Sequence, residues 1–287
     1  MKVLSLESFL TLIKYKVSLA VTFTAATGYL VCSGSFDLRF FQLVAAVFIL
    51  AGGSGALNQF QERNYDELME RTRFRPIPSQ KITPRFALLL SVLLILAGLI
   101  CLYFAFGVVP ALLGVFNIVW YNLFYTNLKR VSAFAVVPGS LVGAIPVFIG
   151  WTAAGGYLFE LSIVFIAFFI FIWQIPHFWL LVIKYGDQYE KAGFPTINQS
   201  ISINGLRKII FSWVVATSLF SMAIPLFLRY LSWDFFLVVF LLNITFVFIF
   251  TKLSFGKVAD MNLKKSFISI NVYMILFMGL LILYHLS

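Results

Sequence analysis

Long apolar segments follow one another along the whole chain. Each run of about 18 to 25 residues is long enough to cross roughly 30 Å of hydrocarbon as a helix. A helix satisfies its backbone hydrogen bonds internally, which segments in lipid must do. The chain of 287 residues is 61% hydrophobic and only 11% charged, more apolar than a soluble domain requires. We therefore expect an all-α polytopic membrane protein with nine spans, at 15–34, 40–61, 86–106, 108–126, 133–152, 158–183, 207–230, 234–252 and 266–285.

The basic residues fall on one side of these predicted spans. All Lys and Arg except Arg39 and Arg229 lie on the N-terminal segment or on every second connection. Cytoplasmic loops carry such an excess, so we expect a cytoplasmic N-terminus and a C-terminus outside. The net charge of +10 then attracts anionic lipid and diphosphate. No basic stripe alternates with aromatic residues on a soluble surface, so we expect no nucleic acid partner.

Several other classes of protein lack support in the sequence. Cys32 and Cys101 both lie in apolar runs, which argues against a disulfide framework or a cysteine metal site. No small-residue cleavage site precedes the first apolar run, so we expect no removed signal peptide. The chain has no GxxxxGK[ST] or GxGxxG loop, and ATP-driven or dinucleotide chemistry is therefore not indicated.

Charge is concentrated after the second predicted span, in the segment NQFQERNYDELMERTRFR at 58–75. Asn58, Glu62 and Asp66 are four residues apart, so on a helix they line one face. Two carboxylates at this spacing repel each other until a divalent cation lies between them, and Mg²⁺ prefers such oxygen ligands when it also holds phosphates. The arginines that follow can bind the same phosphates. The alternative is an ordinary cytoplasmic loop, charged because it is solvated.

A second acidic cluster follows the sixth predicted span, in KYGDQYEKAGFPTINQSISINGL. Asp187 and Glu190 are three residues apart and share a face if a helical turn begins at Asp187. Two acid clusters on one side of the membrane can meet in the folded bundle and hold two Mg²⁺ ions against a diphosphate. Because the segment has no apolar run, we expect a short amphipathic or irregular cap over the cytoplasmic mouth.

Polar residues inside apolar spans give further candidates. Tyr121 and Tyr125 share a helix face that leads to Lys129 and Arg130, although an interfacial aromatic belt with basic anchors has the same pattern. Gln174 and His177 flank Pro176 in the sixth span, and an ionisable residue there is a functional-site hypothesis. The alternative is a neutral histidine bonded to a backbone carbonyl that the proline frees. Asn243 and Asn271 are predicted to make interhelical hydrogen bonds.

The segment NQFQERNYDELMERTRFRP resembles the first acidic motif of the UbiA superfamily of intramembrane prenyltransferases. The segments YTNLKR, GAIPVFIGW and WQIPHFW…YGDQYEKAGFP are similar to its haem-farnesylating branch. The resemblance implies one domain over 1–287, a nine-helix bundle around a central cavity that opens to the cytoplasmic side. It also implies Mg²⁺-dependent transfer of a farnesyl group from farnesyl diphosphate to a vinyl group of haem b, which makes haem O.

The resemblance also implies residue roles. The catalytic residues would be Asn58, Glu62, Asp66 and Asp187, and Mg²⁺ would be held by Glu62, Asp66 and Asp187. Substrate binding would fall to Arg71, Arg75, Tyr121, Tyr125, Lys129, Arg130, His177, Lys184 and Tyr185. Basic side chains would neutralise the diphosphate, and His177 would ligate or orient the haem iron. The faces of Tyr121, Tyr125 and Phe178 would stabilise an allylic cation.

The implied setting is a bacterial plasma (inner) membrane, with membrane lipid, farnesyl diphosphate and haem b as partners and a haem A synthase or terminal oxidase as an assembly partner. The sequence departs from the branch at Glu62 and Asn64, where Asp is usual, and at Gln188, which follows Asp187 where a second acid is usual. One competing hypothesis is a UbiA-type enzyme that prenylates a quinone or chlorin precursor. Another is a transporter or scaffold, but transporters usually place ionisable groups near the midplane, and charge here gathers at one membrane surface.

Overall fold

The structure is a computed structural model that describes residues 5–197, 201–228, 233–255 and 262–286. Three basic residues counted in the charge distribution, Lys2, Arg229 and Lys257, lie outside these ranges. All regular elements within the ranges are helices, and nine of them are long and apolar enough to cross a membrane. The expected all-α fold with nine spans is therefore confirmed.

Six spans are single α-helices: α2 (Tyr15–Ser33), α3 (Leu38–Leu68), α4 (Pro84–Phe106), α9 (Leu161–Lys191), α11 (Trp233–Phe255) and α12 (Leu263–Leu286). Three spans are composite. The first joins α5 (Val108–Ile118), the π-helix η1 (Val119–Tyr125) and α6 (Thr126–Leu128), the second α7 (Val136–Gly139) and α8 (Leu141–Ala153), and the third α10 (Ile203–Ala223) and the 3₁₀-helix η3 (Ile224–Phe227). The short helix α1 (Leu6–Leu12) precedes the first span.

Local sequence signals set the start of several helices. The Asp37 side chain accepts a hydrogen bond of 2.8 Å from the backbone N–H of Phe40 and caps α3. Thr83 caps α4 in the same way, with Pro84 at the first helical position. Each of these caps satisfies a backbone N–H that has no partner within the helix.

Two expected helix ends, at 61 and 183, are wrong. Helix α3 continues to Leu68 and α9 to Lys191, well into the polar sequence. Hydropathy marks where the apolar run stops, whereas a helix stops where its backbone hydrogen bonding stops. The extra turns carry the acidic residues of both clusters on regular helices rather than on loops.

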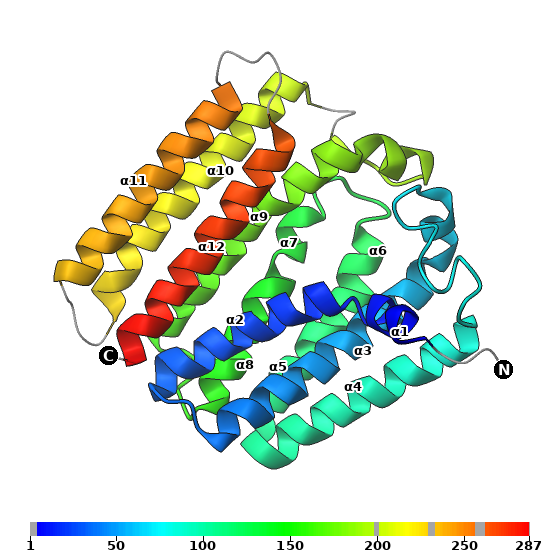
Figure 1. The fold of residues 1–287 in the computed structure, drawn as a ribbon, viewed down its shortest axis with the longest axis horizontal. Coiled ribbons are helices and arrows are strands. Elements are labelled where there is room, and N and C mark those ends of the chain that lie inside the picture. Colours follow the sequence, from blue (N-terminus) through cyan, green and yellow to red (C-terminus); the bar gives the residue numbers. More distant parts are fainter. Residues whose placement is uncertain (1–4, 198–200, 229–232, 256–261, 287) are drawn as a thin grey trace.

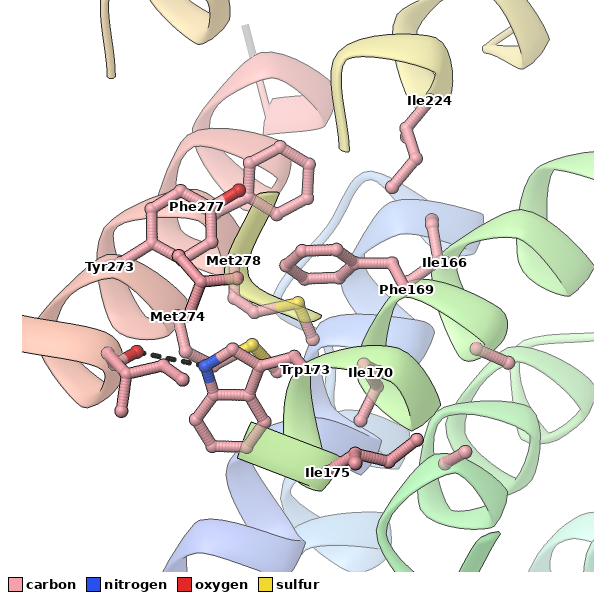
Figure 2. Close-up of a cluster of buried hydrophobic side chains, with 14 of the residues drawn as sticks. Ile166, Phe169, Ile170, Trp173, Ile175, Ile224, Tyr273, Met274, Phe277 and Met278 are labelled. Carbon is pink, nitrogen blue, oxygen red and sulfur yellow. Dashed lines mark hydrogen bonds between the residues drawn. The ribbon is translucent and has the colours of Figure 1, made fainter. Parts of the chain in front are cut away.

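Helix α9 lies at the centre of the larger hydrophobic cluster and packs against α8, α10 and α12. Figure 2 shows Phe169 and Trp173 of α9 facing Tyr273 and Phe277 of α12, with the Trp173 Nε1–H donating 2.9 Å to the carbonyl oxygen of Ile270. Figure 1 shows the chain ends at opposite ends of the bundle and the end of α9 beside the loop that follows α3. This arrangement brings the two polar clusters of the sequence to the same end.

Candidate active site

A cavity of about 310 Å³ lies among five of the spans and reaches from an apolar part to a charged part. The apolar part includes Val21, Val47, Leu50 and Ile149. The charged part, which we call the charged end, is lined by Lys14, Asn58, Glu62, Asp66, Arg71, Arg75 and Lys129. A single cavity within the membrane spans therefore has both apolar walls and fixed charges.

The polar row of α3 forms one wall of the charged end. Asn58, Glu62 and Asp66 have exposed fractions of 1%, 4% and 0%, so the two carboxylates need partners. Arg75 supplies one, because its Nη1 lies 2.8 and 2.7 Å from the two carboxylate oxygens of Asp66. Lys129 forms an ion pair with Glu62. The four-residue spacing thus places all three side chains in the cavity, as predicted.

Lys14 is a member of the charged end that sequence reasoning counted only as a topology signal. It lies between α1 and α2 in the left-handed backbone conformation, with φ of 49°. Its Nζ donates to the Asn58 Oδ1 and lies 3.3 Å from the Tyr121 hydroxyl. Burial, and then the charge of Arg75, lowers the pKa of Lys14 to about 7. A lysine before an apolar run looks like any positive-inside anchor, so the sequence pattern did not distinguish this one.

Gln59 stabilises the turn between α1 and α2, which directs the Lys14 side chain into the cavity. Its Nε2–H group donates to the backbone carbonyls of Thr11, at 2.6 Å, and of Leu12, at 3.1 Å. A left-handed conformation is uncommon for a residue other than glycine and persists where its surroundings impose it. The position of the lysine is therefore built into the fold.

Aromatic side chains form a stack in the wall of the cavity. The rings of Tyr121 and Tyr125 are stacked with centroids 6.0 Å apart, and Phe178 continues the stack 6.4 Å from Tyr125. The tyrosines lie on the π-helix η1, a distortion that is frequent at functional sites. Gly139 makes room for Tyr125, since a Cβ there would lie 2.4 Å from its ring. All three predicted aromatic residues line the cavity.

The loop after α3 meets the end of α9 through Arg71. The Arg71 guanidinium lies 4.6 Å from the Tyr185 ring centroid and donates 3.1 Å to the Tyr189 hydroxyl, while its backbone N–H donates 3.1 Å to the Gln188 Oε1. Phe194, in the irregular segment that follows α9, packs on Tyr189 and lines the cavity. The two segments therefore meet through Arg71 and aromatic side chains rather than through their acids, and part of the expected cap, residues 198–200, lies outside the described residues.

Asp187 is the predicted metal ligand that the structure does not bring to this wall. It is exposed and does not line the cavity. Tyr185 and Tyr189, four residues apart on α9, face Arg71, so Asp187 midway between them points to roughly the opposite side of the helix. Among the residues described, no group of three or more His, Cys, Asp or Glu side chains is placed to hold a metal ion.

Four predicted binding residues also lie outside the cavity lining: Arg130, His177, Lys184 and Tyr185, of which Tyr185 reaches the site only through its contact with Arg71. The Arg130 Nη2 donates 3.1 Å to the Gln61 carbonyl oxygen, and its guanidinium covers the Tyr65 ring. Lys184 is exposed. His177 packs against Trp173 and against Phe267 of α12, with ring centroids 4.9 Å apart in both cases, and its buried Nδ1 has no hydrogen-bond partner.

The predicted metal-binding side chains on α3 do fit Mg²⁺. Glu62 and Asp66 provide two carboxylates and Asn58 an amide oxygen on one helix face, all hard oxygen ligands. Mg²⁺ is commonly bound through one or two carboxylates, with water and substrate phosphates in its other positions. The wall therefore fits a metal ion that is held jointly with a phosphate ligand.

The chain is similar to known proteins over most of its length. A family model described as the UbiA prenyltransferase family matches residues 20–281. A protoheme IX farnesyltransferase of Geobacter sulfurreducens is 37% identical over 218 residues, which is 76% of this chain and 80% of the relative. A protoheme IX farnesyltransferase of Neorickettsia sennetsu is 33% identical over 250 residues, which is 85% of this chain and 82% of the relative.

Solved structures share the fold. A UbiA homolog from Archaeoglobus fulgidus bound to GPP and Mg²⁺ superimposes with a TM-score of 0.74 at 14% identity, covering 98% of this chain and 99% of that one. A digeranylgeranylglyceryl phosphate synthase gives a TM-score of 0.78 at 17% identity, covering 98% of both chains. The family match extends over nearly the whole chain, and the protein therefore belongs to the UbiA prenyltransferase family.

Proposed function

We propose that this protein transfers the farnesyl group of farnesyl diphosphate to a vinyl group of haem b, which makes haem O. The names of its relatives support this acceptor. The observation that carries the proposal is a single cavity with paired charges at one end and apolar walls at the other. Such a space suits an isoprenoid diphosphate, whose polyanionic head and apolar tail need these two environments.

The charged end would bind the diphosphate. Mg²⁺ held by Asn58, Glu62 and Asp66 would supply positive charge to the departing phosphate oxygens. The basic side chains of Lys14, Arg71, Arg75 and Lys129 line the same end and neutralise the remaining charge. Because the carboxylates hold Arg75 and Lys129 in the cavity, these cations are already oriented before the substrate arrives.

The aromatic stack would stabilise the cation that forms next. The bond between C1 of the farnesyl group and the diphosphate oxygen breaks with both electrons on oxygen. The faces of Tyr121, Tyr125 and Phe178 attract the resulting allylic cation. The terminal vinyl carbon of haem then bonds to C1, which leaves a second cation on the vinyl carbon beside the porphyrin. Water adds there, and one proton is released.

For the membrane, the orientation and the assembly partner, we keep the predictions made from the sequence. We place the protein in a bacterial inner membrane, with its N-terminus in the cytoplasm and its C-terminus outside, and a haem A synthase or a terminal oxidase is the predicted assembly partner. The proposed mechanism assigns no step to five predicted site residues, because none of them lines the cavity: Arg130, His177, Lys184, Tyr185 and Asp187.

The mass of the haem product tests this function. Purified protein in detergent is incubated with farnesyl diphosphate, Mg²⁺ and haem b, and in parallel with a quinone or chlorin precursor. We expect haem that has gained one farnesyl group and one hydroxyl group, and no product after chelation of divalent cations. Prenylation of the other acceptors alone would replace haem as the substrate, and an absence of any product would favour a transporter or scaffold.

A further inference from the structure

Two amide side chains in the cavity have buried oxygens without hydrogen-bond partners. They are the Oε1 of Gln174 on α9 and the Oδ1 of Asn117 on α5, and both residues line the cavity. An unpaired buried polar atom costs about 1–3 kcal/mol, and its presence in an apolar region needs an explanation. Among the described residues, these are the two neutral side chains of the cavity lining with such an atom.

The fold makes specific room for one of these amides. A Cβ added to Gly143 of α8 would lie 1.9 Å from the Gln174 Nε2 and 2.6 Å from its Oε1. Any larger residue at position 143 would therefore expel the amide from this place. The glycine therefore makes room for a polar group in the cavity wall.

Both amides lie one helical turn from the aromatic stack. Asn117 precedes Tyr121 by four residues on the same span, and Gln174 precedes Phe178 by four on α9. Four residues of α-helix rise about 6 Å, so each amide lies close to the ring next to it. The stack is where the proposed mechanism places C1 of the farnesyl group. The second cation forms only two carbon–carbon bonds from C1, within reach of the same region.

The proposed reaction needs one water molecule near the aromatic stack, and it needs it only after the second cation has formed. Water that reaches the first allylic cation would hydrolyse the farnesyl donor, whereas the second cation must receive water to become an alcohol. A buried water requires two to four polar partners, and an amide offers both a donor and an acceptor. Each of the two amides therefore offers an unpaired acceptor oxygen to an ordered water in apolar surroundings.

We infer that Gln174 and Asn117 are positioning residues that hold the water which hydrates the second cation. The water oxygen bonds to the cationic carbon beside the porphyrin, and the proton passes to an oxygen of the released diphosphate. Without an ordered water, the same cation loses a proton from the adjacent carbon and gives an alkene. The two amides thus decide between an alcohol and an alkene after the farnesyl group has been transferred. This inference rests on the proposed function.

The ratio of the two products tests the inference. Gln174→Leu, Asn117→Leu and the double variant are incubated with farnesyl diphosphate, haem b and Mg²⁺ in ¹⁸O-labelled water, and extracted haems are resolved by mass. We expect the ratio of labelled alcohol to alkene to fall about tenfold in each single variant, the change that loss of one ordinary hydrogen bond produces. Gln174→Met, which retains the length of the side chain without its amide, should show the same fall.

The matched control is Gln42→Leu, the same chemical change at an exposed position of α3 away from the cavity, where the ratio should stay as in the wild type. An unchanged ratio in the double variant overturns the inference, whatever the total yield. Loss of both products in all variants with folded protein also overturns it, because the amides would then act before the second cation forms. Absence of farnesylated haem from the wild type would instead refute the proposed function.

Discussion

Two groups of buried polar side chains in this bundle satisfy the same physical demand in different ways. Between α10, α11 and α12, the Asn243 Oδ1 lies 2.7, 2.9 and 2.9 Å from the hydroxyl oxygens of Ser218, Ser221 and Tyr273. The Asn243 Nδ2–H donates 2.8 Å to the Val239 carbonyl oxygen. This neutral network is closed, because its polar groups are satisfied by one another. It confirms the interhelical bonding predicted for Asn243, whereas the Asn271 Nδ2–H donates 2.5 Å to the Phe267 carbonyl oxygen of its own helix.

The charged end of the cavity is arranged differently. Its carboxylates are matched by cations that a ligand can also reach, and deeper in the cavity the amides of Asn117 and Gln174 keep unpartnered oxygens. The comparison shows that a polar residue inside a membrane helix does not by itself indicate function. A closed neutral network holds helices together, whereas charges and open acceptors that face a cavity indicate a ligand.

The largest effect should separate two aspartates that the sequence treats alike. We expect Asp66→Ala to lower the rate of farnesyl transfer by about a thousandfold, because it removes a proposed metal ligand and the partner of Arg75. Asp187→Ala should change the rate by less than about threefold, since a solvated side chain away from the site has little effect. Initial rates with farnesyl diphosphate and haem b measure both.

Asp66→Asn and size-exclusion chromatography serve as controls for folding. Equal losses in the Asp66 and Asp187 variants would show that α9 contributes an acid to the site after all. Position in the cavity wall or on the exposed side of α9 would then not determine which aspartate is needed for the reaction.

The different placement of these aspartates also shows what the sequence can predict. Asn58, Glu62 and Asp66 share a face because they lie on one continuous helix, and this follows from spacing alone. For Asp187, the sequence predicted a helix end at 183, which left its direction undetermined. The helix in fact continues to Lys191, and its phase turns Tyr185 and Tyr189 toward Arg71 and Asp187 away.

A smaller effect should distinguish two lysines that are two residues apart. Lys14→Met should lower kcat/KM for farnesyl diphosphate by roughly 10- to 100-fold, the range for loss of a hydrogen bond to a charged group. Lys16→Met should stay within about twofold, because Lys16 is exposed beside the Tyr15 ring and does not line the cavity. Steady-state kinetics at saturating haem b measure both variants. Similar losses in the two would reduce Lys14 to a surface anchor.

The role of Lys14 illustrates why part of the site escaped prediction. Nine apolar runs predict nine spans, since lipid imposes helices on them. The direction of the Lys14 side chain depends instead on a left-handed backbone and on bonds from Gln59, which is distant in sequence. Gly143 and Gln174 meet in the same way, through packing of α8 on α9. Such contacts between spans leave no periodic pattern in the sequence.

The smallest effect should appear in the closed network and should concern stability rather than catalysis. Asn243→Ala leaves the hydroxyls of Ser218, Ser221 and Tyr273 without their shared acceptor, and we expect it to lower the free energy of unfolding by about 1–2 kcal/mol. KM for farnesyl diphosphate should stay unchanged. Asn58→Ala, which removes an amide from the cavity wall together with its 3.0 Å hydrogen bond to the Thr126 Oγ1, should lower kcat/KM in addition to stability. Thermal unfolding in detergent and steady-state kinetics on both variants provide the test. If the two asparagines affect stability and catalysis in equal proportion, then closure of a polar network does not distinguish packing from function in this fold.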